Sequence, residues 1–218
     1  MISSRADFDN RHALAAGLAD RVARGLSRAI SRQGSAVLAL SGGTTPTLFF
    51  EHLSQQDISW EKVTVTLVDE RQVDETSSRS NAKLVKVSLM QNMAKVARFV
   101  PLYQNHNAAE KLVLDVVVLG MGEDGHTASF FPAGDNLSEA LNYKTSAAII
   151  TMQAPAAGEP RLTYTLPALL KAKVICLHIE GQKKQAVLET ALAGTDMMQM
   201  PIRAVLQADN PLEIFWCP

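Results

Sequence analysis

The sequence predicts an α/β fold with a mostly parallel sheet and helices on both faces of that sheet. Short apolar runs alternate with helical patterns along the 218 residues, which is the order of strands and crossover helices in such a sheet. The run at 115–119 (DVVVL) shows no alternation of apolar and polar side chains, as is typical of a strand covered on both faces. Since no repeat, low-complexity tract or long linker divides the chain, we expect a single domain over residues 1–218.

Composition argues against several classes of protein. Hydrophobic residues make up 47% and charged residues 20%, which is ordinary for a folded chain and wrong for a disordered one. The formal charge of −1 leaves no basic field for a nucleic acid or an acidic membrane surface. Cys176 and Cys217 match no metal spacing and imply no disulfide framework, which suits a reducing cytosol. With no secretory signal and no apolar run near the ~20 residues of a membrane span, we expect a cytoplasmic protein.

The first element is a long helix. Apolar residues recur at every fourth position from Leu14 to Ile30, with arginines between them, so an apolar stripe alternates with a solvated face. Asp9 or Asn10 is placed to cap its start. Gly34 is placed to end it in a left-handed conformation.

The remaining elements follow from the same patterns. Strands are predicted at 36–40, 63–68, 115–119, 147–152, 174–179 and 212–216, with a short ambiguous run at 98–102. Helices are predicted at 46–53, 80–89, 166–171 and 183–192, the second of them capped by Ser80. Residues 154–160 (APAAGEP) are predicted to form a loop that is free to move.

Ligands of such sheets bind beyond the carboxyl ends of the strands, and three predicted strands end in unusual residues. The residues after strand 36–40 are Ser41, Gly42, Gly43, Thr44, Thr45 and Pro46. Paired glycines let the backbone turn sharply and bring N–H groups near a ligand, while Thr44 or Thr45 can cap the next helix. Such a helix start binds anions, most naturally phosphate, although the same residues also suit a plain turn and do not have P-loop spacing.

Charged residues follow the second of these strands, 63–68. Asp69, Glu70 and Arg71 come directly after it, which is typical of a strand that simply exits to solvent. At the ligand edge of the sheet, however, the carboxylate of Asp69 can hold sugar hydroxyls and Arg71 can contact an anion.

A glycine-rich segment, residues 119–127 (LGMGEDGHT), follows the third strand. Glycines at 120, 122 and 125 spell the dinucleotide fingerprint G-x-G-x-x-G, but Phe130 to Pro132 interrupt the long helix that this fingerprint should open. A better interpretation is a loop that presents Asp124 and His126. Histidine is the usual proton carrier in hydrolysis, and Asp124 is placed to orient its ring; a purely structural pair remains the alternative.

Two further cations are candidates for binding a phosphate. Arg161 precedes the segment 162–165 (LTYT), and Lys184 lies at the start of a predicted helix after Gly181. Each is placed to neutralise an anion, with a solvated side chain as the alternative. No role is assigned to His12, His52, His106 or His178.

In order, these segments resemble the motifs of the 6-phosphogluconolactonases. The matching segments are 38–46 (LALSGGTTP), 68–71 (VDER) with Ser80-Asn81, 119–127, 161–170 (RLTYTLPALL), 181–184 (GQKK), 201–206 (PIRAVL) and 212–216 (LEIFW). They cover nearly the whole chain in the order of that family. The resemblance implies hydrolysis of 6-phospho-D-glucono-1,5-lactone to 6-phosphogluconate in the oxidative pentose phosphate pathway. It also implies a Rossmann-like fold shared with glucosamine-6-phosphate deaminases.

The resemblance also implies roles for particular residues. It makes His126 the catalytic base and Asp124 its neighbour. The residues that it assigns to substrate binding are Ser41, Gly42, Gly43, Thr44, Thr45, Asp69, Arg71, Arg161 and Lys184. It implies no cofactor and no metal, and a sugar-phosphate lactone as the small-molecule partner; we expect a monomer or weak homodimer that binds neither nucleic acid nor membrane.

The sequence departs from the family at two places near the second strand end. Residues 72–74 (QVD) replace an aromatic residue and a proline found in many relatives, and Arg79 is a cation that the family pattern does not predict. The sequence therefore does not predict which of these residues contact the phosphate.

Three other functions are weighed against this one. An amino-sugar-phosphate deaminase carries a glutamate five residues beyond the loop histidine, where this chain has Phe131. A sugar-phosphate sensor usually adds a helix-turn-helix segment, for which the residues before the first predicted strand leave too little room. A dinucleotide-dependent oxidoreductase rests only on the glycine spacing.

Overall fold

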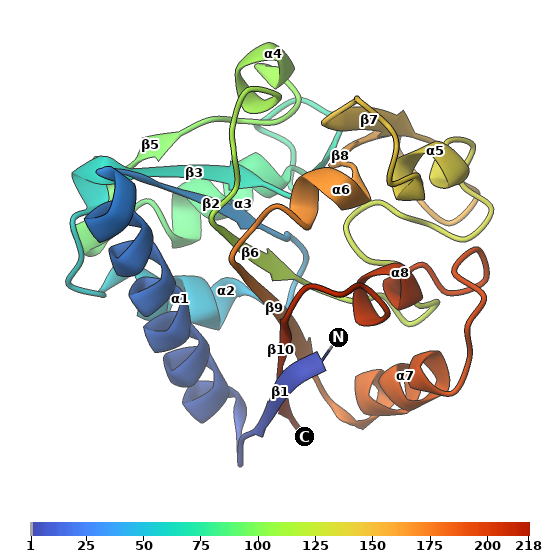
Figure 1. The fold of residues 1–218 in the computed structure, drawn as a ribbon. Coiled ribbons are helices and arrows are strands. Elements are labelled where there is room, and N and C mark those ends of the chain that lie inside the picture. Colours follow the sequence, from blue (N-terminus) through green and yellow to red (C-terminus); the bar gives the residue numbers. More distant parts are fainter. Residues whose placement is uncertain (1) are drawn as a thin grey trace.

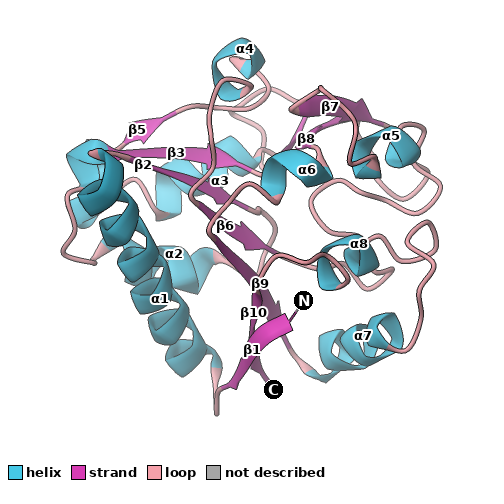
Figure 2. Ribbon diagram, viewed as in Figure 1, coloured by secondary structure: helices cyan, strands magenta, loops and turns pink. Residues whose placement is uncertain are grey.

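The centre of the fold is a seven-stranded sheet, described here from a computed structural model that covers residues 2–218. Its order is β1-β10-β9-β6-β2-β3-β5, and every strand pair in it is parallel (Figures 1 and 2). The strands are β1 (Ile2–Asp7), β2 (Ala36–Leu40), β3 (Val63–Leu67), β5 (Arg98–Phe99), β6 (Val116–Leu119), β9 (Val174–Glu180) and β10 (Leu212–Cys217). This confirms the predicted sheet and adds β1, whose mixed ISSRAD sequence carries no strand pattern.

A second sheet has three antiparallel strands and was not predicted. It consists of β4 (Asp69–Arg71), β8 (Arg161–Tyr164) and β7 (Ile149–Met152), in the order β4-β8-β7. The prediction that 147–152 belongs to the main sheet is therefore wrong. Residues 69–71 are likewise not an exit to solvent, because they form a strand in which Asp69 and Glu70 are buried.

Helices cover both faces of the main sheet, as predicted. They are α1 (Arg11–Gln33), α2 (Thr47–Ser54), α3 (Asn81–Ser88), α4 (His106–Ala109), α5 (Leu137–Leu141), α6 (Leu166–Leu169), α7 (Gln182–Leu192) and α8 (Ile202–Leu206), with 3-10 turns at Trp60–Lys62 and Asn92–Val96. Figure 1 shows α1 and α2 on one side of the strands and α7 and α8 on the other. Four of the described helices, α4, α5, α6 and α8, have five residues or fewer, which is too few to show a full helical period; of these only α6 was predicted.

The ends of α1 are those that the sequence predicts. The Asn10 side chain accepts a hydrogen bond from the Ala13 amide at 3.0 Å, and Gly34 ends the helix with a φ of 85°. Only a glycine adopts this left-handed backbone without strain. Ser80 caps α3 in the same way as Asn10 caps α1, since its Oγ accepts from the Lys83 amide.

The start of α2 differs from the prediction. Neither Thr44 nor Thr45 caps it, because Pro46 occupies the N-cap position with helical backbone angles, and no side chain within residues 2–218 bonds to the first turn. The backbone N–H groups at the start of this helix are therefore not paired with side chains, and they can donate to a ligand.

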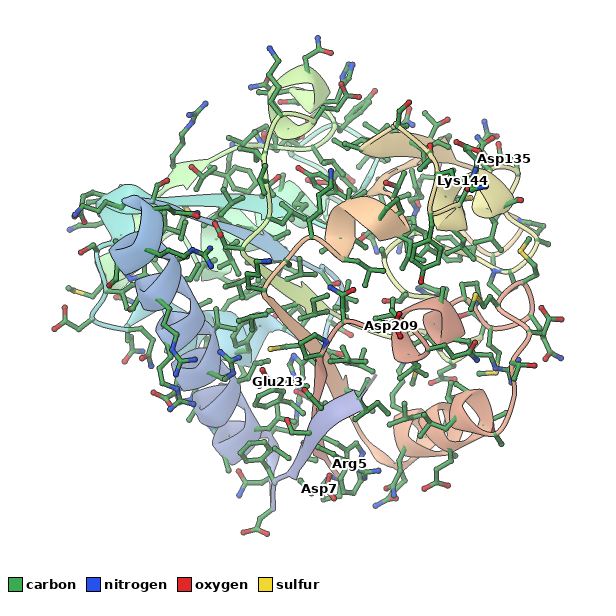
Figure 3. All side chains as sticks on the ribbon, in the orientation of Figure 1. Arg5, Asp7, Asp135, Lys144, Asp209 and Glu213 are labelled. Carbon is green, nitrogen blue, oxygen red and sulfur yellow. The ribbon has the colours of Figure 1, made fainter. Side chains whose placement is uncertain are left out.

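The core packs between the sheet and its helices, and most charged side chains lie outside it, with Asp69, Glu70 and Arg161 among the buried exceptions. Arg5, Asp7 and Asp135 lie at the periphery in Figure 3. The Arg21 guanidinium pairs with the Glu213 carboxylate at 2.5 Å and joins α1 to β10. No helix within residues 2–218 has the length and apolar character needed to cross a bilayer. The single-domain interpretation stays a prediction.

Candidate active site

The candidate site is a cavity of about 320 Å³ at the carboxyl ends of β2, β3, β6 and β9. It is lined by all nine residues that the sequence analysis assigns to substrate binding: Ser41, Gly42, Gly43, Thr44, Thr45, Asp69, Arg71, Arg161 and Lys184. His126 also lines it, and Asp124 lies directly behind His126. Segments far apart in sequence meet here because the carboxyl ends of parallel strands share one edge.

His126 and Asp124 form a pair at the end of β6. The imidazole Nδ1 lies 2.5 Å from Asp124 Oδ1, which also accepts the His126 backbone N–H at 3.1 Å. Burial acts to raise the pKa of Asp124, but hydrogen bonding and charge interaction with His126 outweigh it and leave this pKa below its usual value. An ionised Asp124 favours the tautomer with the proton on Nδ1, so Nε2 is left as the proton acceptor. Nε2 has no hydrogen-bond partner among the described residues.

The glycines around this pair have a steric reason that differs from nucleotide binding. A Cβ on Gly122 would lie 2.0 Å from His126 Nδ1 and 2.5 Å from Asp124 Oδ1, so only glycine leaves room for the pair. Gly125 has a φ of 78°, and a Cβ there would meet Met200. The next helix within residues 2–218 is α5, which is short and begins only at Leu137. The structure therefore lacks, in these residues, the long helix that a dinucleotide fingerprint opens.

Phe131 holds the other side of the imidazole. Its ring stacks on that of His126 at 4.3 Å between centroids and 28° between planes, and the Arg161 guanidinium lies 5.4 Å from the Phe131 centroid. One aromatic ring thus contacts both the candidate base and a candidate phosphate ligand. This contact of Phe131 could not be predicted from the sequence, where Phe131 counted only against a dinucleotide site and against a deaminase.

Asp69 and Arg161 are buried next to each other. Asp69 Oδ2 accepts a hydrogen bond from Ser129 Oγ at 2.5 Å and lies 4.0 Å from the Arg161 guanidinium. Asp69 Oδ1 has no partner among the described residues, and Asp69 lines the cavity, so this oxygen can accept from a sugar hydroxyl. Burial lowers the pKa of Arg161, partly offset by the charge of Asp69, and the guanidinium stays protonated. Ser129 was not predicted.

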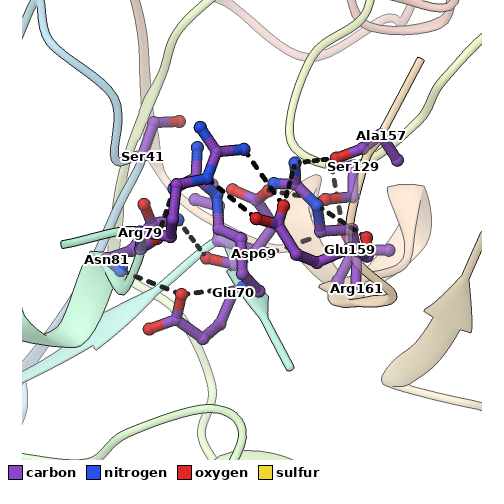
Figure 4. Close-up of polar contacts among 12 residues, drawn as sticks. Ser41, Asp69, Glu70, Arg79, Asn81, Ser129, Ala157, Glu159 and Arg161 are labelled. Carbon is purple, nitrogen blue, oxygen red and sulfur yellow. Dashed lines mark hydrogen bonds and ion pairs between the residues drawn. The ribbon is translucent and has the colours of Figure 1, made fainter. Parts of the chain in front are cut away.

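Glu70 anchors the start of α3 beneath the cavity. Its buried carboxylate accepts from the amides of Arg71 (2.7 Å), Asn81 (2.9 Å) and Ala82 (2.7 Å), and from Ser80 Oγ (3.2 Å), as Figure 4 shows in part. Burial raises the pKa of Glu70, and these hydrogen bonds oppose that rise. Because Glu70 uses the donors of this helix start, α3 has no free N-terminal site for an anion.

Asn81 links this anchor to the glycine turn after β2. Its Nδ2 donates to the Asp69 carbonyl oxygen at 3.0 Å, and a Cβ on Gly42 would lie 1.9 Å from Asn81 Oδ1. Gly42 is therefore required for the turn to pack against the start of α3. The Glu70 and Asn81 contacts join residues more than ten positions apart, and only the Ser80-Asn81 cap hinted at them in the sequence.

The turn at 42–45 has the donors that an anion needs. The backbone amides of Gly42, Gly43, Thr44 and Thr45 bond to no other described residue, while Ser41 Oγ accepts from the Gly120 amide at 3.0 Å. Nearby, Lys184 Nζ donates to the Met121 carbonyl oxygen at 2.5 Å. Burial lowers the pKa of Lys184, while the charges of Glu123 and Asp124 oppose this. A cradle of amides beside a lysine suits a phosphate.

Two more arginines and one histidine line the cavity. Arg71 donates from Nη1 to the Arg79 carbonyl oxygen, and its Nε is buried without a hydrogen-bond partner among the described residues. Arg79, the cation outside the family pattern, pairs with Glu159. His178, to which the sequence analysis gave no role, is buried with Nε2 3.0 Å from Glu180 Oε1. Residues 2–218 contain no group of three or more His, Cys, Asp or Glu side chains placed to hold a metal ion.

Comparisons with known proteins show the family to which the chain belongs. The family model of glucosamine-6-phosphate isomerases/6-phosphogluconolactonase matches residues 9–216. A 6-phosphogluconolactonase of Rhizobium meliloti is 51% identical over 97% of both chains, and one of Mesorhizobium japonicum is 52% identical over 97% of this chain and 94% of that one. A crystal structure of a 6-phosphogluconolactonase from Shewanella baltica superimposes with a TM-score of 0.94 at 38% identity and covers 100% of both chains. The chain belongs to the glucosamine-6-phosphate isomerase/6-phosphogluconolactonase family of enzymes.

Proposed function

We propose that the protein is a 6-phosphogluconolactonase, a hydrolase that opens 6-phospho-D-glucono-1,5-lactone to 6-phosphogluconate. The observation that carries this proposal is the His126–Asp124 pair. His126, whose Nε2 has no partner among the described residues, lines the same cavity as residues 42–45, whose backbone amides are also unpaired there. The named relatives support the same substrate. The proposal includes a cytoplasmic monomer or weak homodimer that acts in the oxidative pentose phosphate pathway without a cofactor.

The proposed reaction needs one group that moves a proton twice. Neutral His126 takes a proton from water at Nε2 while the water oxygen bonds to C1 of the lactone. The tetrahedral intermediate then collapses, the bond from C1 to the ring oxygen breaks, and the imidazolium returns its proton to that oxygen. Water is thus added across the ester, and the new carboxyl group ionises in solution. Asp124 stabilises the imidazolium between the two transfers.

The proposed binding mode uses the remaining residues of the cavity. The phosphate lies on the amides of 42–45, with Arg161 and Lys184 as counter-charges. Asp69 accepts from a sugar hydroxyl through the oxygen that Ser129 does not occupy. The phosphate site at one end of the cavity and His126 at the other place C1 of the lactone beside Nε2. Binding of the phosphate thus orients the reacting carbon toward the base.

The test compares three substrates with the wild-type protein. Freshly made 6-phosphogluconolactone should be hydrolysed far faster than its spontaneous rate, and glucono-1,5-lactone, which lacks the phosphate, at least about 100-fold less efficiently in kcat/KM. Release of ammonia from glucosamine 6-phosphate without lactone hydrolysis would make the protein a deaminase instead. Absence of both reactions, with binding of 6-phosphogluconate, would make it a non-catalytic sugar-phosphate-binding protein.

A further inference from the structure

An ion pair joins two loops beside the cavity. Arg79, at the end of the segment 72–80, donates from Nε and Nη2 to the two oxygens of Glu159, at 2.9 and 3.0 Å. Glu159 belongs to the segment 154–160, whose residues Ala156 and Ala157 line the cavity together with Arg79. In Figure 4 Arg79 reaches from the Asn81 side of the site toward Glu159 and Ala157 on the other side.

Glu159 occupies the position of an anion among arginines. Besides its two bonds to Arg79, its Oε2 lies 3.8 Å from Arg161 Nη2. A guanidinium fork binds a carboxylate and a phosphate with the same paired geometry. The Arg79 bonds also hold the pKa of Glu159 at about 2, so the carboxylate is charged at neutral pH.

The pair is accessible to exchange. Side-chain exposure is 53% for Arg79 and 28% for Glu159, so neither partner is locked by packing. Arg161, by contrast, is buried and bonded to the Ala157 carbonyl oxygen. Of these two arginines, Arg79 is the one whose guanidinium can turn toward a ligand without losing buried contacts.

Arg79 also lies near the phosphate cradle. Asn81 packs against Gly42, which brings the start of α3 beside the turn 42–45. Arg79 is the residue before Ser80, the N-cap of this helix. The Arg71 guanidinium bonds to the Arg79 backbone, so a third cation lies next to the same residue. An anion held by the amides of 42–45 is therefore flanked by Arg79 on the side of α3.

From these contacts we propose that Arg79 is a further ligand of the substrate phosphate and that Glu159 holds it until a dianionic phosphate takes it over. This inference rests on the proposed function. A phosphate dianion competes better than a single carboxylate because it carries more charge and more acceptor oxygens. A singly charged anion does not displace Glu159, so the pair makes the cavity selective for the phosphorylated sugar, and the segment 154–160 is released when substrate binds.

The test is equilibrium binding measured by calorimetry with three probes: 6-phosphogluconate, inorganic phosphate and unphosphorylated gluconate. The variants are Arg79→Gln, Glu159→Gln and the double variant. The control is Arg24→Gln, which breaks an exposed arginine–aspartate pair on α1, remote from the cavity. We expect Arg79→Gln to weaken binding of both phosphorylated probes by about ten-fold and Glu159→Gln to strengthen it about three-fold. Gluconate binding and the control should not change.

The double variant distinguishes two roles of Glu159: release of Arg79 to the phosphate, or a purely structural link between the two loops. If Glu159 acts by holding Arg79, the double variant binds as Arg79→Gln does, within about two-fold, because removal of Arg79 leaves little to release. Equal weakening by both single variants, or wild-type binding by Arg79→Gln, would overturn the inference. If wild type neither hydrolyses the lactone nor binds 6-phosphogluconate, the proposed function fails, while the inorganic phosphate arm still decides whether Arg79 and Glu159 exchange an anion.

Discussion

The loop that carries His126 and the loops joined by Arg79 and Glu159 are both parts of one cavity, but they are held in opposite ways. His126 is fixed by short-range geometry: the Gly122 amide donates to the His126 carbonyl oxygen at 2.8 Å, Asp124 holds Nδ1, and Phe131 stacks on the ring. Arg79 and Glu159 are held to each other by an ion pair between partly exposed side chains.

This difference matches the two tasks that we assign to the regions. A proton-transfer group must stay within hydrogen-bond distance of the reacting atoms, and the bond to Asp124 and the stacking on Phe131 hold His126 in this position. A group that admits the substrate must release its partner, and a partly exposed ion pair that no ring or steric contact supports costs little to separate. Perturbing the first region should therefore lower kcat, and perturbing the second should change phosphate affinity and little else.

Among variants that leave His126 itself in place, the largest effect is expected from Gly122→Ala. The new Cβ would overlap His126 Nδ1 and Asp124 Oδ1, so the pair must separate, and kcat should fall by about 100-fold. Steady-state kinetics with the lactone would measure this. Gly120→Ala is the matched control in the same loop, because its Cβ would meet only Ser41 Cβ at 3.9 Å. Equal losses in both variants would show that the loop, and not the Gly122 contact, is responsible.

A smaller effect is expected when the aromatic ring between the base and the phosphate ligand is removed. Phe131→Leu keeps an apolar side chain but loses the stacking on His126 and the contact with Arg161, so kcat/KM should fall by about ten-fold. Phe131→Tyr keeps the ring and should retain most of the wild-type value. Wild-type kinetics in Phe131→Leu would mean that the ring positions neither group.

The smallest effect should come from the exposed pair, in stability. The pKa of Glu159 is about 2 in the folded protein, against a usual 4.5, chiefly because Arg79 donates to it. Because the folded pKa is lowered, the stabilisation is complete above about pH 4.5 and is lost as the pH falls through about 2. Glu159→Gln should therefore lower Tm by only about 1–2 °C near pH 7, by a smaller amount at pH 3, and less in high salt. A Tm difference that grows toward acid pH would contradict this.

The sequence predicted the edge of the sheet where the site lies because that inference needs only the order of strands. Strands 36–40, 63–68 and 115–119 are recognisable from apolar runs, and parallel strands bring their ends together. All nine predicted substrate-binding residues accordingly line one cavity. Their roles in binding, like the role of His126 as base, are proposals.

The sheet formed by β4, β8 and β7 could not be predicted for a physical reason. β4 (DER) consists of charged residues, and β8 (RLTY) is a four-residue segment that begins with one, so neither shows a clear strand pattern. The charges of Asp69 and Arg161 are satisfied in the structure by contacts between segments far apart in the chain. Glu70, Ser129 and Asn81 were missed for the same reason: their partners lie ten or more positions away, and no local pattern records such contacts.

The start of α2 shows the limit of a local rule. Threonines before a helix favour a side-chain cap, but Pro46 takes the N-cap position with helical angles, and the amides of the preceding turn stay open. The prediction of an anion site at this turn thus rests on free backbone donors and not on the threonine cap.

The central claim, that His126 carries the proton in lactone hydrolysis, is tested most directly by kcat of His126→Ala with freshly made 6-phosphogluconolactone, corrected for spontaneous hydrolysis. The account predicts that kcat falls by about 10²–10⁴-fold, while KM and Tm stay near their wild-type values, because the phosphate contacts and the core do not involve this side chain. Wild-type kcat in a folded His126→Ala protein would contradict the assignment of the base while leaving the substrate in place.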